Sequence, residues 1–186
     1  MLLYKIINNI AVDFTQYRDI PVTSQVVIHP VTLPDNIKLW TDSLGLDIPV
    51  CELFVTPPGE HTGVFLHIDE DGTDKDIPKF NWANGVGEMI WMQPKKDNIR
   101  SIKYLTDHGN AYLRLAKPSC TEVGRTVIKN ETTLINGGVP HMIDYTGNVP
   151  RYCLSVAVFL KGKRPTMNEI LELIRNKSSI LDAETT

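Results

Sequence analysis

Two histidines and one aspartate have the spacing of a metal site. His67 and Asp69 lie two residues apart in residues 63–69, whose alternating pattern predicts a β-strand. Because side chains alternate along a strand, both would point to the same face. His141 follows a Gly-Gly turn and begins another predicted strand. Two imidazoles and one carboxylate form the facial triad that holds iron(II) and leaves coordination positions open for other ligands.

Arg151 adds a cation ten residues after His141, just past a turn at residues 146–150. We expect strands 141–145 and 151–159 to pair as an antiparallel hairpin, which places the two residues on the order of 10 Å apart at roughly 3.3 Å per residue. A short dicarboxylate that chelates the metal would then reach the guanidinium, whose planar fork binds a carboxylate through two hydrogen bonds. Alternation puts Cys153 and Ser155 on the same face. There Ser155 offers a hydroxyl donor, and Cys153 a small pocket wall.

Other residues near these motifs have weaker claims to the site. Asn81 lining the pocket and Asn81 in a structural role have about equal weight, whereas Trp82 and Trp91 fit a hydrophobic core better. Arg125 is the rival cation, but it lies in mid-strand without a fixed relation to the distal histidine. The remaining histidines are expected at a pocket rim or loop, in a structural segment and in a solvated turn, respectively: His61, His29 and His108.

The elements that must position these residues are mostly strands. Turn residues separate eight predicted strands, at 51–56, 63–69, 88–93, 111–116, 121–129, 132–136, 141–145 and 151–159, and two entry strands precede them near 3–12 and 25–29. Many short strands of this kind indicate a sandwich, a barrel or a jelly roll. A short helix is predicted at 33–45, with a second helix at about 166–177. The second helix starts with a capping box at Thr166 and Glu169, and its apolar face should pack outside the β core.

Composition limits the class of protein. The chain has 186 residues, enough for one domain, with 42 % hydrophobic and 22 % charged residues, as in a soluble globular protein. The net charge of −3, without a basic stripe, argues against a nucleic-acid surface. Three scattered cysteines indicate a reducing compartment, and the interrupted N-terminus does not suit a signal peptide or membrane span. We therefore expect a cytoplasmic protein, either a monomer or a homodimer.

The chain resembles the 2-oxoglutarate- and iron(II)-dependent dioxygenases over roughly residues 51–160. The resemblance lies in the His-x-Asp pair at 67 and 69, the distal histidine at 141, and an arginine ten residues after it. Three further segments match: residues 52–59, which lead into the His-x-Asp strand, Asn81-Trp82, and residues 134–136 before the distal histidine. Within that superfamily the chain is most similar to the aspartyl/asparaginyl β-hydroxylase-like and phage-type members.

This resemblance implies a single domain with an all-β core, folded as a double-stranded β-helix or cupin-like jelly roll. The implied iron(II) ligands and catalytic centre are His67, Asp69 and His141, and Arg151 would bind the distal carboxylate of 2-oxoglutarate. The reaction would decarboxylate 2-oxoglutarate to succinate and carbon dioxide. Dioxygen would couple this step to hydroxylation of a C–H bond in a protein side chain or small molecule.

Many members of the superfamily carry a small polar residue two positions after the arginine, where this chain has Cys153, so Ser155 would have to substitute.

Two other classes of function stay open. A cupin-like protein that uses another metal is one alternative, although such sites usually draw on more histidines than this motif offers. A jelly-roll binding module without turnover, for example a viral accessory protein, is the other.

Overall fold

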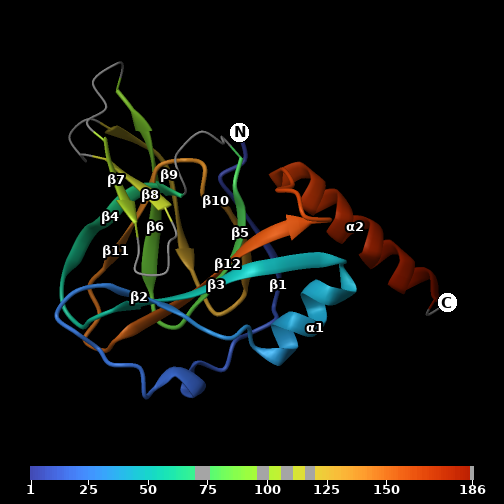
Figure 1. The fold of residues 1–186 in the computed structure, drawn as a ribbon, viewed down its shortest axis with the longest axis horizontal. Helices are drawn as coiled ribbons and strands as arrows, with labels where there is room; N and C mark the ends of the chain where they lie inside the picture. The colour runs from blue at the N-terminus through green and yellow to red at the C-terminus, as the bar shows by residue number, and fades with distance from the viewer. Residues whose placement is uncertain (70–75, 96–100, 106–110, 116–119, 185–186) are drawn as a thin grey trace.

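The computed structural model describes residues 1–186 except for residues 70–75, 96–100, 106–110, 116–119 and 185–186. Its described part forms two antiparallel β-sheets of six strands each and two α-helices (Figure 1). The expected all-β core is confirmed at this level. Within the described residues the two sheets stay separate and do not close into a barrel. Neither described helix is long and apolar enough to cross a membrane.

We call the two sheets sheet 1 and sheet 2. Sheet 1 has the order β1 (Tyr4–Asn8), β10 (Thr132–Asn136), β5 (Pro78–Ala83), β12 (Arg151–Leu160), β3 (Leu46–Thr56) and β2 (Val27–Pro30). Sheet 2 has the order β7 (Ser101–Leu105), β8 (Ala111–Leu115), β4 (His61–Asp69), β11 (His141–Tyr145), β6 (Gly87–Pro94) and β9 (Cys120–Ile128). Strands β3 to β6 alternate between the two sheets, and so do strands β9 to β12. Between these two runs, the consecutive strands β6, β7, β8 and β9 all belong to sheet 2.

Strand β5, inside sheet 1, is buried on both faces. Phe80 and Trp82 point away from sheet 2 into the larger hydrophobic cluster, where the Trp82 Nε1 donates to the Ile10 carbonyl at 3.0 Å. Lys79 and Asn81 alternate with them and point toward sheet 2, because successive side chains on a strand face opposite ways. This strand therefore presents polar groups to the space between the two sheets.

The helices α1 (Asp35–Ser43) and α2 (Met167–Glu184) cover the outer face of sheet 1, on the side away from sheet 2 (Figure 1). A short 3-10 helix, η1 (Phe14–Tyr17), adds to the same cluster. The capping box of α2 is confirmed, since the Thr166 backbone N donates to the Glu169 carboxylate at 2.7 Å and the Glu169 N donates to the Thr166 hydroxyl at 3.2 Å. Both predicted helices thus pack outside the β core.

The predicted hairpin of strands 141–145 and 151–159 is wrong. β11 pairs with β4 and β6 in sheet 2, whereas β12 pairs with β3 and β5 in sheet 1. A connection of a few residues is long enough to cross the roughly 10 Å between packed sheets. β12 is buried on both faces, and because the chain crosses to sheet 1 before it, β12 has a strand neighbour on each side, β3 and β5. Arg151 and His141 therefore face the cavity from opposite sheets and do not belong to one β-ladder.

Candidate metal centre

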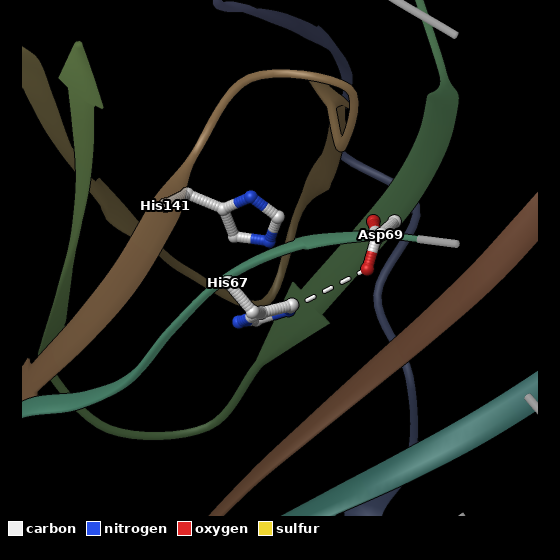
Figure 2. A group of neighbouring side chains, drawn as sticks. All are labelled: His67, Asp69 and His141. Atoms are coloured by element: carbon white, nitrogen blue, oxygen red, sulfur yellow. Dashed lines mark ion pairs between the residues drawn. The ribbon is translucent and has the colours of Figure 1, made fainter. Parts of the chain in front are cut away.

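His67, Asp69 and His141 meet at one point on the inner face of sheet 2. β4 and β11 are neighbours, and His67 lies directly opposite His141 in their register. One ligand atom from each of the three residues lies within 4.8 Å of the others (Figure 2). The two imidazole ring centroids are 4.3 Å apart, and the His67 Nε2 lies 3.4 Å from the Asp69 Oδ1. All three side chains are buried, so the cluster is shielded from competing water.

The ring of His141 is held in one orientation by the backbone. Its Nδ1 lies 2.9 Å from the Val139 carbonyl oxygen. A carbonyl only accepts hydrogen bonds, so Nδ1 carries the proton and Nε2 keeps its lone pair for a metal. Burial lowers the pKa of His141 to about 4, and nearby His67 acts in the same direction. The ring is therefore neutral at physiological pH, as a metal ligand must be.

Asp69 is ionised although it is buried. Burial alone would raise the pKa of its carboxyl group, but the Lys79 ammonium and the neighbouring histidines outweigh burial and hold it well below its usual range. The Lys79 Nζ lies 3.1 Å from the Asp69 Oδ2, and both side chains are almost fully buried. Lys79 carries no motif that marks it as a site residue in the sequence. Its alternation with Phe80 and Trp82 is the signal that could have placed it on the inner face of a strand.

Asn136 fixes the turn that leads into His141. Its Oδ1 accepts hydrogen bonds from the backbone N of Ile77 at 3.0 Å and of Gly138 at 2.9 Å. The carbonyl of Gly137 in turn accepts from the backbone N of Asp69 at 3.0 Å. The turn therefore joins the strand that carries His67 and Asp69 to the strand that carries His141.

A cavity between the two sheets extends from the triad. All six residues proposed from the sequence line it: His67, Asp69, His141, Arg151, Ser155 and Asn81. Cys153 lines it as well, which confirms that β12 turns this face inward. The Ser155 hydroxyl donates to the Asn81 Oδ1 at 3.0 Å, so these two polar groups form one pair in the cavity wall.

Arg151 lies at the far end of this cavity from the triad. Its side chain is 1 % exposed, and its Nε and Nη2 have no hydrogen-bond partner among the described residues. The guanidinium lies over Gly87, where a Cβ atom would overlap its Nε and approach its Cζ to 3.0 Å. Gly87 pairs with Tyr145, four residues along β11 from His141, or roughly 13 Å at 3.3 Å per residue. Ile143 and Met89 line the cavity between the two ends.

The other weaker candidates that the structure describes, apart from Asn81, do not line the cavity. Trp82 faces the outer cluster, and Trp91 stacks on Tyr4 with ring centroids 5.3 Å apart. Arg125 is about half exposed and pairs with Glu88 and Glu122 on the surface. The Nε2 of His61 lies 3.4 Å from the Pro58 carbonyl oxygen at the start of β4, and His29 is in β2, whereas His108 is outside the described residues.

Comparison with models of known protein families gives no match, and comparison with curated proteins gives no relative. The geometry of the cavity is therefore the basis for any assignment of function.

Proposed function

We propose that this protein is an iron(II)- and 2-oxoglutarate-dependent dioxygenase that hydroxylates a C–H bond of its substrate. We also infer that the two sheets are the halves of a double-stranded β-helix. The alternation of consecutive strands between the sheets supports this inference, because a jelly roll is built from two sheets in this way. The motif-bearing strands β3 to β12 would form that core, with the helices outside it.

The donor set fits iron(II). His67 and His141 each offer an imidazole nitrogen and Asp69 offers a carboxylate oxygen, and these three atoms lie within 4.8 Å of one another. Such an arrangement leaves positions free on the cavity side for further ligands. When bound, iron(II) would supply dioxygen activation, and 2-oxoglutarate would supply two electrons through its oxidative decarboxylation to succinate.

The observation that carries the proposal is the buried, partly unsatisfied guanidinium of Arg151 in the same cavity as the triad. A buried cation without its full set of partners is costly unless an anion completes it. A dicarboxylate that chelates the metal at one end would place its other carboxylate at Arg151. Its methylene groups would then lie against Ile143 and Met89, and the Asn81–Ser155 pair would border it.

The proposal is tested by anaerobic titration of the protein with iron(II) and then 2-oxoglutarate. We expect a weak visible charge-transfer band that requires both ligands. In air the same mixture should release succinate in measurable amounts, even without added substrate.

His67→Ala should abolish the band by removing a metal ligand, while Arg125→Ala, at the exposed surface arginine, should leave it unchanged. A protein that binds iron(II) but shows neither the band nor succinate would contradict the proposal. That result would favour a binding module or a site for a different metal.

A further inference from the structure

We propose that Lys79 is a positioning residue that holds the second carboxylate oxygen of Asp69. Asp69 then gives the metal one oxygen only, and the adjacent coordination position stays open for an anionic chelator. The identity of that chelator as 2-oxoglutarate rests on the proposed function. The effect of Lys79 on the metal site does not rest on it.

The two oxygens of Asp69 face different partners. Oδ1 lies on the side of the histidines, 3.4 Å from the His67 Nε2. Oδ2 lies on the side of sheet 1, 3.1 Å from the Lys79 Nζ. Lys79 reaches across the cavity from β5, whereas Asp69 belongs to β4, so this ion pair joins the two sheets next to the triad.

Gly137 closes the carboxylate in from another side. A Cβ atom at this position would overlap the Asp69 Oδ2 and lie 2.8 Å from its Cγ, so only glycine leaves room for this oxygen. The backbone of Asp69 is tied to the same residue by the hydrogen bond from its N to the Gly137 carbonyl at 3.0 Å. The carboxylate is thus confined between Gly137 and the Lys79 ammonium, and its rotation toward a two-oxygen contact with the metal is opposed.

Lys79 should act on a bound cation and a bound anion in opposite directions. Its positive charge at a metal-ligating carboxylate competes with the metal for electron density and repels the metal directly. The same charge attracts an anion that coordinates the metal nearby, and the low dielectric of a buried cavity strengthens both effects. A residue that only supported the fold would change both affinities in the same direction.

The test compares Lys79→Met, which keeps the length but removes the charge, with Lys79→Arg, which keeps the charge. Cobalt(II) replaces iron(II) as a spectroscopic probe, and its absorption bands report the number of coordinated atoms. We expect Lys79→Met to bind cobalt(II) at least as tightly as the wild type, with a spectrum shifted toward higher coordination. Its cobalt(II) form should bind 2-oxoglutarate about tenfold more weakly or worse, and Lys79→Arg should retain both wild-type affinities.

Two results would overturn the inference. One is an equal loss of cobalt(II) and 2-oxoglutarate affinity in Lys79→Met, which would make Lys79 a structural residue. The other is an unchanged cobalt(II) spectrum. If wild-type cobalt(II) protein does not bind 2-oxoglutarate, the proposed function fails, and the cobalt(II) spectra alone still decide the role of Lys79. Should Lys79→Met not fold, Lys79→Gln repeats the comparison with a neutral side chain that still donates a hydrogen bond.

Discussion

At the scale of single residues, the arginine in the cavity is a buried cation whose hydrogen bonds are only partly satisfied by the described residues. The β12 alternation turns Arg151 inward, and the missing side chain of Gly87 gives its guanidinium space. Nε and Nη2 find no acceptor among the described residues. Leaving buried donors unsatisfied costs about 1–3 kcal/mol for each polar group, and more for a charged one. A residue kept at such a cost is more readily explained by a ligand than by the fold.

Arg151→Met should therefore separate ligand binding from stability. Without ligands, the variant should unfold at the same temperature as the wild type or a higher one, because a buried charge has been replaced by an apolar chain. With metal present, 2-oxoglutarate at about 100 times its Kd should raise the wild-type midpoint by roughly 5–10 °C and leave the variant nearly unchanged. Differential scanning calorimetry of both proteins provides the measurement.

Arg125→Met is the matched control, because Arg125 pairs with surface carboxylates and not with the cavity. It should keep the full ligand-induced shift. An equal shift in Arg151→Met and the wild type would show that the dicarboxylate binds elsewhere.

The hydrogen bond between Ser155 and Asn81 in the cavity wall clarifies the role of Ser155. Its hydroxyl proton is donated to the Asn81 Oδ1, and the Asn81 Nδ2 is left facing the Cys153 sulfur at 3.9 Å. A sulfur at that distance is a weak acceptor, so the amide nitrogen of Asn81 is the better remaining donor for a ligand. Burial raises the pKa of the Cys153 thiol, which therefore stays neutral. Cys153 thus serves as a pocket wall, as its size suggests.

At the scale of elements, two glycines leave room for the groups at the opposite ends of the cavity. Gly137→Ala should weaken metal binding by at least about tenfold, because the new methyl group overlaps the Asp69 carboxylate. Gly87→Ala should displace the Arg151 guanidinium, so it should weaken 2-oxoglutarate binding and leave metal affinity unchanged. Isothermal titration with cobalt(II), followed by 2-oxoglutarate, distinguishes the two effects.

Val86→Ala is the control for Gly87→Ala, since Val86 directly precedes Gly87 and its side chain is exposed. It should change neither affinity. If Gly87→Ala and Gly137→Ala give the same pattern of losses, the two ends of the cavity do not act separately.

Sequence patterns could predict the members of the triad but not how sheet 1 meets sheet 2. His67 and Asp69 depend only on alternation within one strand, so local pattern suffices. The partner of a strand is set by long-range packing, and the hairpin rule therefore failed for β11 and β12. Lys79 was missed for a related reason. Its strand, β5, is buried on both faces, yet it exposes lysine and asparagine to a cavity that only the assembled sheets create.

At the scale of the whole molecule, the site is divided between the two sheets. Sheet 2 supplies the three proposed metal ligands, while sheet 1 supplies Arg151, Lys79, Asn81 and Ser155. The metal alone needs only sheet 2. A dicarboxylate that reaches Arg151 would touch both sheets, so it should add contacts between the sheets that the metal alone does not make.

Hydrogen exchange should show this difference between the ligands. Metal alone is expected to slow amide exchange in β4 and β11, whose side chains it joins, with little change in β12. Adding 2-oxoglutarate should extend the protection to β12 near Arg151 and to β5, because opening either sheet would then break ligand contacts. Exchange followed by mass spectrometry of peptides from these strands measures the effect, with edge strand β2 as an internal reference.

The variant Arg151→Met decides how the protection is transmitted. If the ligand spans the cavity, this variant should keep the metal-induced protection of β4 and β11 and lose the additional protection of β12 and β5. General stabilisation of the fold would instead slow β2 along with the other strands in both proteins. Protection of β12 that persists in the variant would mean that the dicarboxylate stabilises sheet 1 without the guanidinium, and would contradict the bridging role of Arg151.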